Sequence, residues 1–212
     1  MDRIHNGVVL GVVSDWDLAI DVSKPQTHTG FEVTGTVPFM AIDLLSEEAL
    51  SGQVKHLYRH DLEAMFYILV WVLCCYKDGC RLHPLPSKFD EWTQSTMAHC
   101  YYLKNSLLGD GWKSTAATYS WGLAERELAE NLRMYFNTAY ASREDANARW
   151  RKAHVRAQFL GGVEPSPLVE ADEAEEVWAE FCGVVKTSIV DTISILPGTL
   201  ALPPRLAALV RE

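Results

Sequence analysis

Cysteine is scarce in this sequence, and none of it has the spacing of a redox or metal site. The 212 residues include five cysteines and no C-x-x-C pair, and two of the five lie next to each other in an apolar run. Such a pattern favours reduced thiols over a disulfide framework. Met1 is followed at once by the polar stretch Asp2 to Asn6, so a signal peptide is also missing. We therefore expect an intracellular protein of the cytoplasm or nucleus, not a secreted one.

Long hydrophobic runs and an excess of positive charge are missing as well. The unbroken apolar run of residues 65–75 would rise only about 16 Å as a helix, whereas a membrane span needs about 20 apolar residues. Lys and Arg total 19 against 28 Asp and Glu, which gives a net charge of −9. A broad nucleic-acid surface needs the opposite sign. We expect neither a membrane nor a nucleic acid as partner.

The apolar run belongs to residues 58–76, YRHDLEAMFYILVWVLCCY, which predict a helix. A helix that is apolar on all sides belongs in the middle of a folded domain. A short buried strand is the alternative, but the length favours a helix. The composition, 48% hydrophobic and 22% charged, indicates one globular domain over residues 1–212 with a sizeable core.

Most of the remaining pattern is helical. Helices are predicted over 89–108, 121–140 and 177–195, where apolar residues recur every three to four positions. Residues 8–13 predict a strand, paired with residues 1–4 through the turn signal Asn6-Gly7. Residues 141–176 predict a flexible or helical insertion, basic over 143–156 and acidic over 170–180. These two charged stretches could pair, but a solvated insertion is the simpler interpretation.

Three motifs then follow one another in a telling order. They are Asp15 to Ala19 (DWDLA) after the strand, Gly35 to Leu45 (GTVPFMAIDLL), and Tyr58 to Glu63 (YRHDLE) at the start of the central helix. This order resembles the fungal-type protein kinase family, whose versions of the DFG and APE motifs have these forms. The resemblance covers roughly residues 8–108. It implies a mainly α fold: the C-terminal lobe of a protein kinase with a short N-terminal β-hairpin and no N-terminal lobe.

The resemblance also implies roles for individual residues. Asp15 would ligate the Mg²⁺ that bridges the phosphates of ATP. Residues 16–43 would form the activation segment, with Thr34, Gly35 and Thr36 near the substrate. Asp43 stands where the family usually has the longer Glu, which puts the usual arginine pairing of that position in question. Asp61, next to Arg59, would be the buried carboxylate that holds the catalytic loop. Taken singly, an Asp after a strand is more often a turn residue, and Asp61 would suit any helix N-terminus.

No match to the kinase loop H-R-D-x-x-x-x-N precedes Asp15, and no G-x-G-x-x-G loop precedes a strand-borne lysine. We therefore expect no catalytic residue in the chain, negligible activity, and no binding of ATP or Mg²⁺ by the chain alone. The parent activity would be phosphoryl transfer from ATP to protein Ser or Thr. The partner would be a protein substrate or a regulatory protein. A non-catalytic, pseudokinase-like interaction module is the alternative, and an incomplete gene model is another.

Two smaller patterns carry less weight. His56 and His60 have the i, i+4 spacing of a zinc site on a helix, but no third ligand is obvious. Gly109 to Ser114 resembles a phosphate loop only weakly, because its spacing is wrong. A Ser/His/Asp triad has no G-x-S-x-G elbow to support it.

Overall fold

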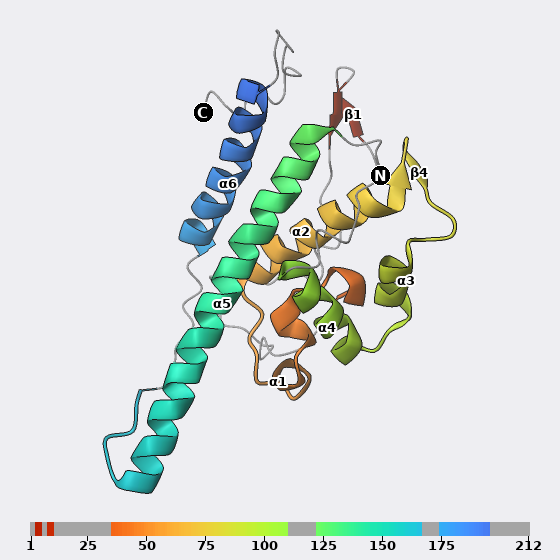
Figure 1. The fold of residues 1–212 in the computed structure, drawn as a ribbon. Helices are drawn as coiled ribbons and strands as arrows, with labels where there is room; N and C mark the ends of the chain where they lie inside the picture. The colour runs from red at the N-terminus through yellow and green to blue at the C-terminus, as the bar shows by residue number, and fades with distance from the viewer. Residues whose placement is uncertain (1–2, 6–7, 11–34, 110–121, 167–173, 196–212) are drawn as a thin grey trace.

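The central helix α2, Tyr58–Cys75, organises the fold (Figure 1). The structure is a computed structural model that describes residues 3–5, 8–10, 35–109, 122–166 and 174–195. The first turn of α2 is closed because the Leu57 N–H donates to His60 Nδ1 at 3.0 Å, while the Leu57 carbonyl accepts from the His60 N–H at 2.9 Å. The helix predicted over 58–76 is therefore confirmed.

A tight hairpin ends α2 at the polar residues Lys77 and Asp78. Strands β3, Tyr76–Lys77, and β4, Cys80–Arg81, pair antiparallel. The two turn residues Asp78 and Gly79 both have positive φ, 51° and 76°. Two consecutive residues with positive φ match the twist of a two-residue hairpin, and Gly tolerates this backbone best.

Burial of α2 is uneven around its circumference. Phe66, Tyr67 and Val70 are completely buried, but Met65 and Ile68 are half exposed. The prediction that this helix is buried on all sides is therefore wrong for the face that carries Met65 and Ile68. These two residues have helical spacing, so they mark one face of α2 that the described residues leave uncovered.

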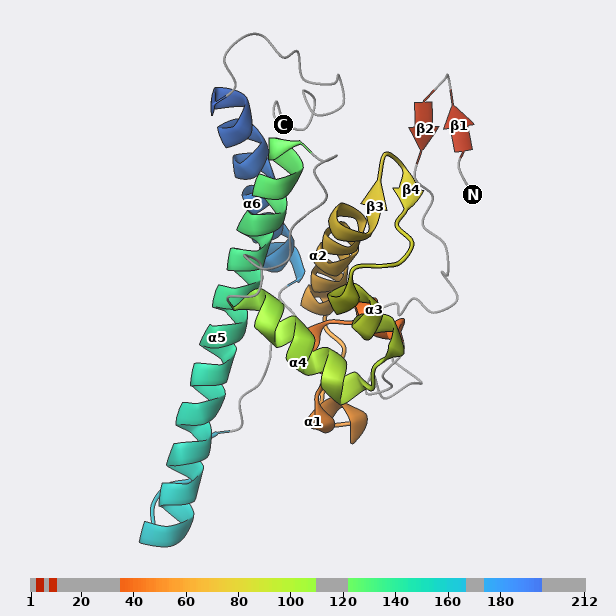
Figure 2. The ribbon, with the colours of Figure 1, turned by 45° about the vertical axis from the view of Figure 1, so that its right-hand side comes forward.

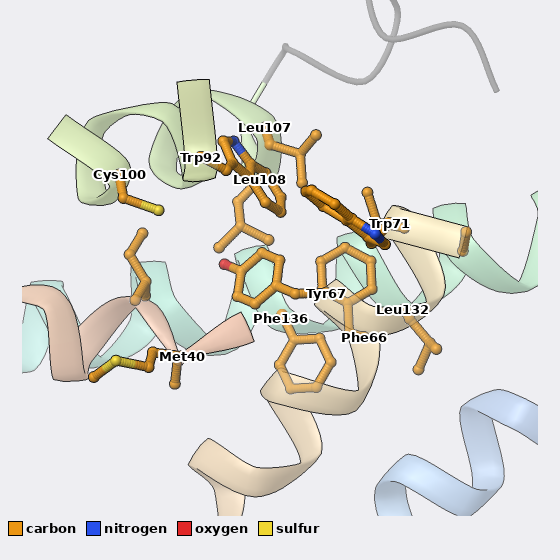
Figure 3. Packing of buried hydrophobic residues seen from close by; sticks show 14 of the residues in the cluster. Met40, Phe66, Tyr67, Trp71, Trp92, Cys100, Leu107, Leu108, Leu132 and Phe136 are labelled. Atoms are coloured by element: carbon orange, nitrogen blue, oxygen red, sulfur yellow. The ribbon is translucent and has the colours of Figure 1, made fainter. Parts of the chain in front are cut away.

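Aromatic side chains join α2 to the helices around it. Helix α3 is Ser87–Gln94, α4 is Met97–Leu108 and α5 is Leu123–Leu160. Tyr67 meets Trp92 edge to face with ring centroids 5.7 Å apart, and Phe66 lies 5.5 Å from Phe136 of α5. Figure 3 shows these side chains meeting in one cluster with Trp71. Such aromatic pairs add about 0.5–1.5 kcal/mol each beyond the area they bury.

The helix predicted over 89–108 is in fact two helices, α3 and α4. The break falls at Ser95 and Thr96, whose backbones are extended. The Thr96 hydroxyl accepts a hydrogen bond from the His99 N–H at 3.3 Å and so caps α4. Thr caps helices well because its side-chain oxygen replaces a missing backbone acceptor. Apolar spacing continues across the break, which is why periodicity alone did not reveal it.

Helix α5 is longer than predicted. It runs without interruption through residues 141–160, so the first part of the predicted insertion is helical. Its 38 residues span about 57 Å. Helix α6, Ala174–Ile195, confirms the helix predicted over residues 177–195. It lies along the first half of α5, and the second half of α5 extends past the other helices (Figures 1 and 2).

The N-terminal hairpin and the turns before α2 complete the described fold. Strand β1, Arg3–His5, pairs antiparallel with β2, Val8–Leu10, with Ile4 opposite Val9. This confirms the predicted hairpin, although residues 11–13 of the predicted strand lie outside the described residues. Two 3-10 turns, η2 at Val37–Phe39 and η3 at Ile42–Leu45, precede helix α1 at Glu47–Leu50. Among the described helices, none combines the length and the apolar character that crossing a bilayer requires.

Candidate functional site

Residues 35–45 form a short irregular segment that is pinned to the helical core. The Phe39 N–H donates to the Thr36 carbonyl at 2.7 Å and begins η2. Met40, Ala41, Ile42, Leu44 and Leu45 are buried, and Phe39 meets Trp71 of α2 edge to face at 5.7 Å. Gly35 and Thr36 at the start of the segment are exposed. The segment is thus fixed at its C-terminal end and open to solvent at its N-terminal end.

Gly35 is suited to this entry. Its φ is +146°, and a Cβ at this position would lie 3.0 Å from Cγ of Met40. Both the backbone angle and the close approach disfavour any other residue. The backbone angle and the contact with Met40 therefore explain why the GTVPFMAIDLL motif begins with glycine.

One carboxylate ties the segment to two distant helices. Asp43 Oδ2 lies 3.1 Å from an Arg59 nitrogen and 3.2 Å from an Arg143 nitrogen, and His60 Nε2 is 3.5 Å away. Burial by itself raises the pKa of Asp43, but the His60 hydrogen bond and the charges of Arg143 and Arg59 outweigh it and hold the pKa well below its usual range. Asp43 thus pairs with two arginines, although its side chain is one methylene shorter than a Glu.

The buried ring of His60 is held in one tautomer. Its Nδ1 accepts the Leu57 N–H at 3.0 Å, so the ring proton sits on Nε2 and points to Asp43. At 3.5 Å the contact with Asp43 is a long one. Burial lowers the pKa of His60 more than the Asp43 carboxylate raises it, so the ring is neutral near pH 7.

A second buried polar group contacts the same segment. Glu63 Oε1 accepts the Ile42 N–H at 2.9 Å and the Tyr67 hydroxyl at 3.0 Å. Lys104 of α4 is fully buried, and its Nζ donates to the carbonyls of Met40 and Val37 and lies 4.0 Å from the centroid of the Tyr67 ring. Burial lowers the pKa of Lys104 to about 8 and raises that of Glu63. Their opposite charges and the hydrogen bonds offset part of this cost.

Asp61 does not occupy the buried position that the kinase resemblance implies. Its side chain is 59% exposed and bonds to His56 Nε2 at 3.0 Å. Arg59, in contrast, turns inward to Asp43. The two histidines with metal-site spacing are therefore engaged separately, His56 with Asp61 and His60 with Leu57 and Asp43.

The remaining predicted residues lie at or beyond the edge of what the structure describes. Asp15 and Thr34 are outside the described residues, and Gly35 and Thr36 are exposed. Within the described ranges, no three His, Cys, Asp or Glu side chains come together in a way that could hold a metal ion. The cluster around Glu63 is fully buried, whereas the one around Asp43 is partly buried and leaves His60 Nε2 with no contact shorter than the 3.5 Å to Asp43. Both clusters hold residues 37–45 against the helices, which is a structural role.

Three of the residues in these clusters were not predicted. Lys104 interrupts the apolar spacing of Cys100 and Leu107 on the buried face of α4, which is an unusual place for a lysine. Arg143 lies two helical turns after Phe136 and so on the same face of α5. The apolar neighbours of Lys104 and the seven-residue spacing between Phe136 and Arg143 would have predicted that both side chains face the core. Glu63 is the last residue of the YRHDLE motif, but the sequence did not predict a contact for its side chain.

A family model described as fungal protein kinase matches residues 2–73. The match confirms the resemblance for about a third of the chain, from the N-terminal hairpin through most of α2. It contains all three motifs on which the resemblance rests. No curated protein and no solved structure shows a significant match to the chain.

Proposed function

We propose that this chain, whose first third matches the fungal protein kinase family, forms part of the larger lobe of such a kinase and carries its protein-substrate platform. The observation that supports this most strongly is the anchoring of residues 37–45 by Asp43 and Glu63, because an activation segment must be fixed at its end to present a protein substrate. The three motifs occur in the order that the family has, which adds support.

The parent activity under this proposal is transfer of the γ-phosphoryl group of ATP to a Ser or Thr hydroxyl. Asp15 would hold Mg²⁺, which bridges and neutralises the phosphates when it is bound. Thr34, Gly35 and Thr36 would face the substrate. In a protein kinase the second metal ligand is the Asn of an H-R-D-x-x-x-x-N loop, and no match to that loop precedes Asp15 in this sequence.

We propose further that these 212 residues do not transfer phosphate by themselves. Phosphoryl transfer depends on positioning, and the general base and the second metal ligand belong to an H-R-D-x-x-x-x-N loop that this sequence does not contain. Purified chain incubated with labelled ATP, Mg²⁺ and a generic protein substrate should show no transfer above background. Calorimetry in the same buffer should show no micromolar affinity for ATP. Transfer that Asp15→Asn abolishes would contradict the proposal.

The alternative is a non-catalytic module that uses the same helical platform to bind a regulatory protein. The half-exposed stripe of Met65 and Ile68 on the central helix favours it, because it is an apolar surface that the described residues leave open. The DNA upstream of the first codon discriminates between the two. An in-frame H-R-D-like loop supports the kinase, and its absence supports the module.

A further inference from the structure

The second half of α5 extends beyond the other described helices. The last side chain that α5 sends to the core is Arg143, which pairs with Asp43 at 3.2 Å. From residue 144 to residue 160 no side chain is buried, and these residues extend about 25 Å. Figure 2 shows this half pointing away from the other helices. A projection of this length gains little stability from the core.

The end of the projection is apolar. We define the α5 tip as residues 149–163. Four of its side chains are large, apolar and exposed: Val155 at 51%, Phe159 at 81%, Leu160 at 73% and Val163 at 96%. Scattered exposed apolar residues are normal, but here they gather at the extremity of one element.

The α5 tip is also positive, although the protein as a whole is negative. Arg149, Arg151, Lys152 and Arg156 lie in it, and no acidic residue occurs between Asp145 and Glu164. Within the described part of the chain, the one ion pair of these four cations joins Arg151 to Glu144 at 3.8 Å. The tip thus carries four positive charges on a chain of net charge −9.

The chain itself covers one side of the tip. The Trp150 indole N–H donates to the Ser166 carbonyl at 2.8 Å, and its ring stacks on His154 with centroids 5.0 Å apart. This folds the residues after Gly161 back along that side. Val155 and Phe159, four residues apart, share the opposite face with Arg151 and Lys152. The free face therefore combines apolar and basic groups.

We propose that the α5 tip binds the surface of an anionic lipid bilayer. Phe159, Leu160 and Val163 enter the headgroup region, and the basic residues behind them contact acidic headgroups. A convex apolar end suits a fluid bilayer, which needs no complementary surface, whereas a protein partner needs a matched interface. Nucleic acid is disfavoured because apolar groups lead and the cations follow. The expectation of no membrane partner came from the lack of an apolar run long enough to span a bilayer, and that criterion does not test binding at a bilayer surface.

Flotation of the full chain with vesicles tests the proposal. One set of vesicles is phosphatidylcholine alone, and the other contains phosphatidylserine as about a third of the lipid. We expect binding to the second set only, and weaker binding at higher salt because screening shortens the range of the attraction. Lys152→Gln with Arg156→Gln should weaken binding about 25-fold, at about fivefold per charge. Phe159→Ser with Leu160→Ser should weaken it at least roughly tenfold.

Matched controls separate the tip from general effects. Lys55→Gln with Lys186→Gln changes the net charge equally at exposed sites elsewhere, and Leu50→Ser with Tyr102→Ser removes two exposed apolar side chains. Both controls should bind as the unaltered chain does, and circular dichroism should show all variants folded. Equal flotation with both vesicle sets, no flotation, or undiminished binding of the tip variants would overturn the proposal. Tight binding to an acidic peptide or to duplex DNA without vesicle binding would do the same.

Discussion

Two aspartates of this chain have opposite surroundings, and the difference lies entirely in what their carboxylates touch. Asp43 contacts two arginines and a buried histidine, while Asp61 sits at the surface with His56. Asp43→Asn should lower the free energy of unfolding by about 1.5–3 kcal/mol, because it removes the charge that two partly buried arginines pair with. Asp61→Asn should lower it by less than about 1 kcal/mol, as for other exposed ion pairs. Urea denaturation of the two variants measures both values.

The same chemical change at both positions makes each variant the control for the other. Equal losses would contradict the assignment of Asp43 as the anchor of residues 35–45. A loss of several kcal/mol for Asp61→Asn alone would mean that Asp61 has the buried role that the kinase resemblance implies.

His60 should make stability depend on pH in a defined direction. Its pKa in the folded protein is below the ordinary 6.5, so as pH falls through 6.5 the unfolded chain gains a proton that the folded protein does not. Stability from His60 is therefore present above pH 6.5 and is lost as pH falls, by up to about 1.4 kcal/mol per pH unit. Asp43 stays ionised in this window because its own pKa lies well below its usual range.

A comparison with His60→Gln isolates this contribution. Glu63, whose raised pKa acts in the opposite direction, is present in both proteins and cancels in the difference. The stability advantage of the unaltered chain over His60→Gln should shrink between pH 7.5 and pH 5.5 in urea titrations. An advantage that stays constant would show that His60 takes up its proton in the folded state as easily as in the unfolded one.

At the scale of the element, apolar periodicity predicted the helices and failed at their ends. The central helix was predictable because residues 58–76 lack Pro and Gly, are apolar without a break over 65–75, and are followed by Lys77-Asp78-Gly79. The break at Thr96 was not, since Trp92 and Cys100 lie eight positions apart and so keep the spacing of one helix face across it. A helix cap is a local competition that apolar spacing does not report. Arg143 was missed for a related reason: its basic neighbours suggested solvent, while its place on the face of Phe136 directs it inward.

The cap of α4 has a measurable value. Thr96→Ala removes the oxygen that accepts the His99 N–H and should lower the free energy of unfolding by about 1 kcal/mol. Thr93→Ala is the matched control, since the Thr93 hydroxyl bonds to the Asp90 carbonyl on an exposed part of α3. It should change stability by less than about 0.5 kcal/mol. If the two variants lose the same amount, Thr96 is no cap.

At the scale of the whole molecule, one helix belongs to two different environments. The first half of α5 packs on α2, α4 and α6 through Ala129, Leu132 and Phe136. The second half contacts mainly itself and the residues that follow it, chiefly through Trp150. Helical stability in proteins comes mostly from such tertiary packing, because short isolated helices are marginal in water. The two halves should therefore differ in local stability although the helix is continuous.

Amide hydrogen exchange followed by mass spectrometry resolves this difference within a single helix. Amides of residues 128–143 should open only with global unfolding, and those of residues 147–160 should exchange at least roughly a hundredfold faster through local opening. The packed half serves as the internal reference, so pH and temperature affect both alike. Trp150→Phe should speed exchange in the second half alone, because it removes the bond to Ser166 and keeps the aromatic ring. Equal protection of the amides along all of α5 would mean that the projecting half is covered in solution. Repeating the measurement over a range of protein concentrations would then show whether a second copy of the chain covers it.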